Sequence, residues 1–292
     1  MKRLLYAIAT LCLCGILLGC QNESAVQIVT TTAPIYEFTT RICADTDLTV
    51  GCIVTENISC LHDYTLQTGQ MRMIENAQTV VISGVGLEDF LADALSASRQ
   101  IIDASNSVEL LCSESSHEHN HGEIHHEEHD PHIWLSPANA RIMAENICDE
   151  LKQIYPQHAD QFANNLQILL SELEELEIYG NAQLSSLSSR QLITFHDGFA
   201  YLADAFDLEI LHAIEEESGS EASAAELIEI CNIVNHNHIN AIFTEVNGNT
   251  SAALIVASET DIPIYQLDMA MSGNGYFKTM YHNIDTLKEA LG

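Results

Sequence analysis

The sequence predicts an α/β protein with two lobes, each a mainly parallel sheet flanked by helices, joined by one long helix. Three observations carry this prediction. Short apolar strands alternate with helical segments over residues 26–155, a pattern typical of parallel βαβ units. Residues 156–185 then read as a single helix, and the alternation restarts over residues 186–292.

The first lobe contains four expected strands separated by helices. The Ser136-Pro137 pair supplies a good N-cap and first helical position, so a further helix begins there and runs to about residue 154. In chain order, we expect strands at residues 26–31, 48–54, 79–83 and 100–103, and helices at 34–42, 68–77 and 87–97.

The joining helix is predicted from one apolar stripe. Its large apolar residues are spaced by 4, 3, 4 and 3 positions, which places them on one face, while acidic residues fill the opposite face. A helix of about 28 residues is roughly 42 Å long, enough to run the length of a two-lobed protein. The stripe consists of Phe162, Leu166, Leu169, Leu173 and Leu176.

The second lobe repeats the strand–helix alternation to the end of the sequence. We expect strands at residues 191–195, 208–214, 240–244 and 262–267, and helices at 198–205, 223–235, 250–259 and 276–291.

Composition limits the function. The 292 residues include 42 acidic and only 10 basic side chains, a formal charge of −32. Binding of nucleic acid requires Lys and Arg to neutralise phosphates, so we expect no nucleic-acid partner. The same charge favours cations and solubility.

The N-terminus reads as a lipoprotein signal. Met1-Lys2-Arg3 is a basic start, residues 4–18 are mostly apolar but short for a membrane span, and Gly19-Cys20 follows. We therefore expect a signal peptide at residues 1–19, lipidation of Cys20 and a tether over residues 20–25. An ordinary secretory signal and an uncleaved anchor are the alternatives.

Six cysteines lie beyond that point, and an exported protein can form disulfides. No zinc-finger spacing occurs, so we interpret them as disulfides or buried thiols; six cysteines allow 15 full pairings. Cys52 and Cys60 are the pair expected to lie closest. The six are Cys43, Cys52, Cys60, Cys112, Cys148 and Cys231.

Residues 114–130 are a histidine-rich, acidic segment without apolar periodicity, which predicts a mobile loop. Imidazoles and carboxylates are metal ligands, so the loop is a candidate auxiliary metal site; a solvated low-complexity loop is the alternative. Its histidines are His117, His119, His121, His125, His126 and His129.

Four further polar residues are candidate metal ligands. His196 and Asp268 directly follow apolar strands, where open parallel sheets bind ligands, while His62 and His132 belong to the first lobe. A cleft between the lobes would bring all four together, and three imidazoles with one carboxylate suit Zn²⁺. Each residue alone has a purely structural alternative.

Carboxylates accompany these histidines. Asp63 and Asp197 directly follow His62 and His196, and a metal-bound imidazole normally donates its other N–H to such a group. Glu245 ends the strand at residues 240–244, where it can orient His196 or add a ligand. The alternative is that these acids favour helix N-termini.

These motifs together resemble the metal-receptor solute-binding lipoproteins of bacterial zinc and manganese ABC importers. The combination of Asp-Pro-His-Ile-Trp-Leu with an upstream histidine-rich loop is highly specific, and the likeness covers essentially the mature chain. It rests on Leu61-His62-Asp63-Tyr64-Thr65, Asp130-Pro131-His132-Ile133-Trp134-Leu135-Ser136-Pro137, Thr194-Phe195-His196-Asp197-Gly198-Phe199, Phe243-Thr244-Glu245 and Asn283-Ile284-Asp285-Thr286-Leu287-Lys288.

The resemblance implies two α/β lobes on a rigid helix and metal ligands at His62, His132, His196 and Asp268. His at the third of these positions resembles the zinc-type members, whereas manganese-type members carry Glu. The implied protein is a monomeric, lipid-anchored, extracytoplasmic receptor that captures Zn²⁺ and delivers it to an ABC permease, without catalysis.

Three alternatives stay open. One is a receptor of the same type for Mn²⁺ or Fe²⁺, and another is a surface adhesin or metal-buffering protein. The third is an exported zinc hydrolase that uses Glu245 or Asp197 as a base. Four protein ligands would close the site to a catalytic water, and the sequence has no HExxH motif, so both observations disfavour a hydrolase.

Overall fold

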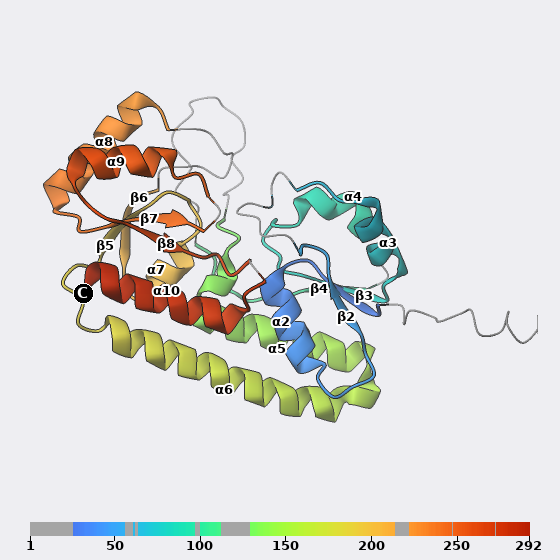
Figure 1. The fold of residues 1–292 in the computed structure, drawn as a ribbon. Coiled ribbons are helices and arrows are strands. Elements are labelled where there is room, and N and C mark those ends of the chain that lie inside the picture. The colour runs from blue at the N-terminus through green and yellow to red at the C-terminus, as the bar shows by residue number, and fades with distance from the viewer. Residues whose placement is uncertain are drawn as a thin grey trace, which may run out of the picture.

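Two parallel four-stranded sheets organise the computed structural model, which describes residues 26–55, 61, 64–96, 100–111, 129–213, 222–246, 248–271 and 273–292. The first sheet has the order β2-β1-β3-β4 and the second β6-β5-β7-β8, and the paired strands within each run parallel. Figure 1 shows the sheets side by side above a long helix, so the predicted fold class is confirmed.

The first lobe begins with β1, which is followed by a helix with a proline in its first turn. Pro34 lies in the first turn of α2, where its missing N–H costs nothing. The elements are β1 (Ile28–Thr30), α2 (Ala33–Ile42), β2 (Val50–Cys52), α3 (Thr68–Asn76), β3 (Thr79–Ile82), a 3₁₀ turn η1 (Asp89–Leu91), α4 (Ala92–Leu95), β4 (Ile101–Asp103), a 3₁₀ turn η2 (Ile133–Leu135) and α5 (Pro137–Ile154).

The helix expected over residues 87–97 is shorter in the structure: in the described residues 87–96, helical structure covers only η1 and α4, from Asp89 to Leu95. The Glu88 carboxylate accepts the backbone N–H groups of Ser83 and Gly84 at 2.7 and 3.0 Å. This contact folds residues 83–88 into a loop, and the backbone of Gly84 takes the left-handed φ of 93° that suits glycine.

The long helix α6 (Ala159–Leu184) follows a 3₁₀ turn η3 (Pro156–His158) and runs beneath both sheets (Figure 1). Its predicted apolar stripe is buried along its whole length, and α2, α5 and α10 pack against it. One apolar core therefore extends from Ile28 in the first sheet to Leu291 in the last helix.

The second lobe follows the same βα alternation, and its outer helices α8 and α9 lie on the far side of the sheet from α10 (Figure 1). Ser223 and Glu226 form a capping box at the start of α8. The elements are β5 (Gln191–Thr194), α7 (Ala200–Ala205), β6 (Glu209–Ala213), α8 (Ala224–Asn237), β7 (Ile242–Glu245), α9 (Ser251–Thr260), β8 (Ile264–Leu267) and α10 (Tyr276–Leu291).

Four of the six mature cysteines lie in the described residues, and all four are free thiols. Burial raises the pKa of Cys43 to about 12 and that of Cys52 to about 11, so both stay protonated at neutral pH. Cys52 is thus a thiol, while its expected neighbour Cys60, and Cys112, lie outside the described residues. The other two thiols are Cys148 and Cys231.

Candidate metal centre

His132 is held by the acidic residue two positions before it. The Asp130 carboxylate lies 2.7 Å from His132 Nδ1 and also accepts the His132 backbone N–H at 2.9 Å. Both side chains are buried. Because Asp130 engages Nδ1, Nε2 is the ring nitrogen suited to bind a metal.

The position of His132 follows from the start of α5. Residues Ile133–Leu135 form a single 3₁₀ turn, and the Ser136 hydroxyl then accepts the Asn139 N–H to cap α5. This turn is apolar and completely buried, so it fixes His132 against the core.

His196 lies just beyond the carboxyl end of β5 and faces His132 from the other lobe. The two ring centroids are 5.5 Å apart, with the ring planes at 76°. The two histidines are 6% and 7% exposed. Two imidazoles from opposite lobes therefore meet in one buried place.

Gly198 lets the chain pass close to the His196 ring. A Cβ atom at this position would lie 2.9 Å from His196 Cδ2 and Nε2 and 2.6 Å from the Met269 methyl group. A larger residue would displace the imidazole, and this steric conflict explains why glycine occupies the third position of the His196-Asp197-Gly198 motif.

Two carboxylates lie at the ends of β7 and β8, the two strands that follow β5 across the sheet. Glu245 ends β7, and its Oε2 is 3.9 Å from His196 Nε2. Asp268 directly follows β8, and its Oδ1 accepts the Ala270 N–H at 2.8 Å. Since β5, β7 and β8 are consecutive in the sheet, their carboxyl ends bring these side chains to one edge.

Asn283 of α10 fixes the backbone of Asp268. Its side chain accepts the Asp268 N–H at 2.9 Å and donates to the Asp268 carbonyl at 2.8 Å. Asn283 stands in one of the segments that carry the family resemblance, but its contact with Asp268 was not predicted. A polar residue in the buried stripe of a helix is a signal that could have indicated it.

The remaining predicted site residues lie mostly outside the described part. Those outside it are His62, Asp63, Cys20 and the loop histidines His117, His119, His121, His125 and His126. His129 is described and half-buried, and Asp197 is half-buried beside His196. Within the described ranges, no group of three or more His, Cys, Asp or Glu residues has an arrangement that could hold a metal ion.

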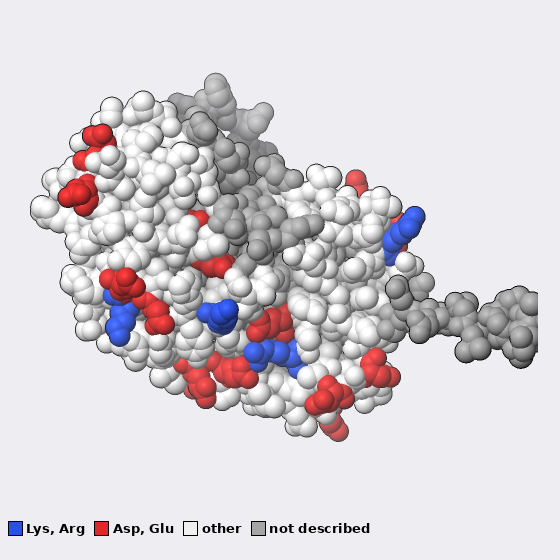
Figure 2. Space-filling view, in the orientation of Figure 1, with Lys and Arg blue, Asp and Glu red and all other residues white. Residues whose placement is uncertain are grey.

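The described part of the site supplies ligand types that suit a cation, although the described residues alone do not bring three of them into a metal-binding arrangement. Glu245 and Asp268 are 4% and 7% exposed, and burying carboxylates is costly unless positive charge or hydrogen bonds compensate. Imidazole nitrogen with carboxylate oxygen is a donor combination that Zn²⁺ accepts. On the face shown in Figure 2, the basic side chains are few and most lie beside acidic ones, in keeping with the formal charge of −32.

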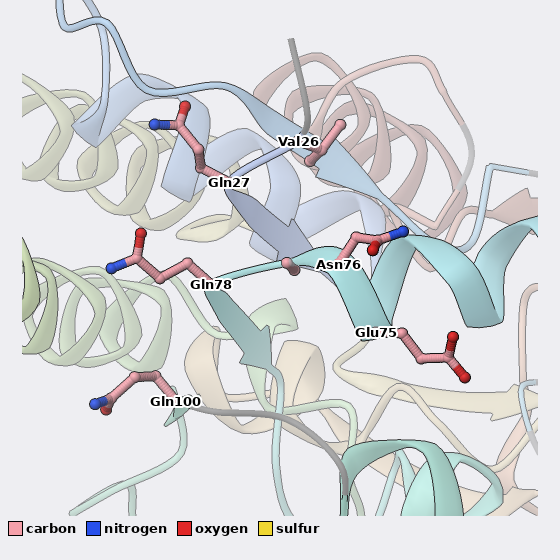
Figure 3. Close-up of a pocket in the computed structure, with 7 residues that line it drawn as sticks. Val26, Gln27, Glu75, Asn76, Gln78 and Gln100 are labelled. Carbon is pink, nitrogen blue, oxygen red and sulfur yellow. The ribbon is translucent and has the colours of Figure 1, made fainter. Parts of the chain in front are cut away.

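A separate hollow of about 460 Å³ lies at the opposite, amino ends of the first sheet. Gln27, Gln78 and Gln100 immediately precede β1, β3 and β4, and Figure 3 shows their side chains extending in the same direction. This hollow has no part in the candidate metal centre, because none of the residues that line it is a candidate metal ligand.

Residues 28–290 match the protein family described as zinc-uptake complex component A periplasmic. The zinc-binding lipoprotein AdcA of Streptococcus pneumoniae (strain ATCC BAA-255 / R6) is 31% identical over 311 residues, an alignment that covers 99% of this chain and 61% of that protein. The chain thus spans about three-fifths of the length of that curated relative.

Solved structures agree with the fold. The crystal structure of ZnuA matches with a TM-score of 0.82 at 27% identity, covering 92% of this chain and 100% of that one. The laminin-binding protein Lbp of Streptococcus pyogenes matches with a TM-score of 0.76 at 25% identity, covering 91% and 98%. The predicted two-lobed architecture is therefore shared with ZnuA and with a laminin-binding protein.

Proposed function

The chain belongs to the family of the periplasmic component A of zinc-uptake complexes, and from this premise we propose that it captures Zn²⁺ between its lobes and delivers it to an ABC permease. The observation that carries the proposal is the buried pair of imidazoles, His132 and His196, which come from opposite lobes and lie 5.5 Å apart. Among close relatives, AdcA is named as a zinc-binding lipoprotein.

The proposed ligands are His62, His132, His196 and Asp268. Three neutral imidazoles and one carboxylate complete a four-coordinate shell, which suits Zn²⁺ and closes the site to catalysis. Asp130, Asp63 and Asp197 orient the imidazoles through their other nitrogens, and Glu245 orients His196 or adds an oxygen.

Capture and release follow from this ligand set. Zn²⁺ enters as the substrate, binds the unprotonated nitrogens of the histidines and ties the two lobes together at one point. Since α6 spans both lobes and packs into the common core, wide hinge opening is restricted, and entry uses local motion near the ligands. Release requires the permease to disturb at least one ligand.

The N-terminal segment and the histidine-rich loop have supporting parts. Lipidation of Cys20 would anchor a monomeric receptor outside the cytoplasm, beside the permease. None of the helices in the described residues is both long and apolar enough to span a bilayer. The loop histidines bind Zn²⁺ as an auxiliary site and lose affinity as they protonate at acid pH.

Calorimetric titration of residues 21–292, with and without residues 114–130, tests this function. We expect one tight Zn²⁺ site that survives loop deletion, resists Mn²⁺ and is lost in His62→Ala. His282→Ala is the matched control, because this histidine is exposed on α10. A tight site for Mn²⁺ or Fe²⁺ would keep the receptor and change its cargo; hydrolysis of a test ester or peptide by the zinc form would favour an enzyme.

Adhesion is a second candidate function because the Lbp structure shares both fold and 25% identity with this chain. Binding to immobilised laminin, measured with the zinc-loaded and metal-free protein, tests it. Growth of a deletion strain under zinc limitation separates adhesion or metal buffering from uptake, since only loss of uptake is relieved by added zinc.

A further inference from the structure

Trp134 lies directly beside the candidate metal centre. It is the single tryptophan of the chain and is completely buried. It stands two residues after His132 in the 3₁₀ turn, and its ring meets the His132 ring edge-on, with centroids 5.4 Å apart at 70°. Its side chain therefore contacts one proposed ligand.

The indole N–H of Trp134 connects this turn to the opposite lobe. It donates a hydrogen bond of 2.8 Å to the carbonyl oxygen of Met269, 135 residues further along the chain. Met269 is the residue directly after Asp268. One buried hydrogen bond thus joins the turn that carries His132 to the turn that carries Asp268.

The turn after β8 is shaped by contacts within its own lobe as well. Asn283 holds the Asp268 backbone, and the Asp268 carboxylate accepts the Ala270 N–H. Ala270 has a φ of 59°, the left-handed region that a residue with a side chain rarely adopts. Because this turn is fixed so tightly, a displacement of the Met269 carbonyl would also move Asp268.

Tyr276, which belongs to the same lobe as Met269, also binds Trp134. Its hydroxyl donates to the Trp134 carbonyl at 2.8 Å, and its backbone N–H, at the start of α10, donates to the Glu37 carboxylate of α2 at 2.6 Å. Burial raises the pKa of Tyr276, so the hydroxyl remains a donor. An acid from one lobe thereby caps a helix of the other, a favourable place for negative charge.

We propose that Trp134 is a positioning residue that sets the separation between His132 and Asp268 and thereby favours Zn²⁺ over Mn²⁺. This inference rests on the proposed function of the site. A four-coordinate Zn²⁺ has short bonds to nitrogen of about 2.0–2.1 Å, whereas Mn²⁺ prefers more oxygen ligands in an octahedral shell. A separation that these hydrogen bonds hold fixed favours the first ion, and a looser one admits the second.

Trp134→Phe in the mature chain tests the proposal, because it keeps an apolar ring and removes the N–H. Affinities for Zn²⁺ and Mn²⁺ are measured by competition with a chelator. Loss of one buried hydrogen bond predicts about tenfold weaker Zn²⁺ binding and little change for Mn²⁺, so the selectivity ratio falls about tenfold. A change of overall stability alone would not move that ratio.

Two further variants keep the test sharp. Tyr276→Phe removes the hydroxyl that holds the Trp134 carbonyl and should lower the same ratio less strongly, which covers the case in which Trp134→Phe does not fold. Tyr179→Phe is the matched control, since its hydroxyl binds Asp285 on the surface, and it should leave both affinities unchanged.

The outcomes distinguish failure of the Trp134 role from failure of the proposed zinc-receptor function. An unchanged Zn²⁺/Mn²⁺ ratio in both Trp134→Phe and Tyr276→Phe, with tight zinc binding in the wild type, would overturn the role of Trp134 alone. Absence of tight zinc binding in the wild-type chain would overturn the proposed function, and the positioning role with it.

Discussion

The imidazole rings of His132 and His196 lie 5.5 Å apart although they belong to different lobes. Each ring arrives there by a separate route: His132 through a buried 3₁₀ turn before α5, and His196 from the carboxyl end of β5. The carboxylates of Asp130 and Glu245 lie beside them at 2.7 and 3.9 Å. Nitrogen donors from both lobes and acidic side chains therefore lie together in one buried place.

Asp130→Asn should weaken Zn²⁺ binding by about 10- to 100-fold, the usual effect of losing the carboxylate that orients a ligating histidine. The amide is similar in size but carries no charge, so the His132 ring loses its strong acceptor. Chelator competition measures the change. Asp160→Asn, on the exposed first turn of α6, is the control and should bind zinc like the wild type. Equal affinity in the two variants would contradict the orienting role.

Gly198→Ala should reduce zinc affinity about tenfold, because its methyl group would lie 2.9 Å from the His196 ring and force it to move. Gly69→Ala is the matched control: it meets nothing within 4 Å, and alanine in helix α3 should raise the free energy of unfolding by about 0.5–1 kcal/mol. Calorimetry and thermal unfolding read both effects. Wild-type affinity in Gly198→Ala would mean that the His196 position tolerates the clash.

Glu88 should make stability depend on pH. Burial raises the pKa of Glu88 to about 7, even though Thr31, Ser83 and Gly84 donate hydrogen bonds that oppose the shift. Its pKa in the unfolded chain is near 4.5. Between these values only the folded state holds the proton, so the contribution is full below about pH 4.5 and is lost as pH rises to 7, by up to about 3 kcal/mol.

Glu88→Gln should remove that slope. Urea unfolding of the metal-free protein at pH values from 5 to 8 measures it as the difference between wild type and variant. Glu145→Gln, an exposed residue of α5, should follow the wild-type curve. Parallel curves for wild type and Glu88→Gln would show that the carboxyl group titrates at its ordinary pKa.

Trp134 should report metal binding directly, because it is the single tryptophan and its ring lies 5.4 Å from the His132 ring. Its emission should be that of a buried indole and should change until one equivalent of Zn²⁺ is bound. The control is Trp134→Phe, which removes the signal. Unchanged emission across a calorimetrically detected tight site would place that site away from His132.

Much of the fold was predictable because its signals are local. Strand–helix alternation and the apolar stripe of α6 depend only on neighbouring residues, and both appear in the structure. The helix expected over residues 87–97 begins later in the structure because the Glu88 carboxylate accepts the N–H groups of Ser83 and Gly84. The Thr31 hydroxyl, 57 positions earlier in the sequence, donates to the same carboxylate, and this contact has no local signal.

The candidate site was likewise predictable only in part. Its residues at strand ends, His196, Glu245 and Asp268, follow from sheet topology and are brought to one edge. The bond from Trp134 to the Met269 carbonyl was not predictable, because it joins residues 135 positions apart and involves a backbone oxygen with no sequence signature. Ligation by His62 stays a prediction.

Calorimetric zinc titration of the wild type, His132→Ala, His196→Ala and the double variant tests the central claim most directly. If imidazoles from the two lobes hold one ion, each single variant loses the same tight site, and the double variant loses nothing more. If either single variant keeps tight binding at one equivalent, the two histidines do not share an ion and the proposed site is wrong.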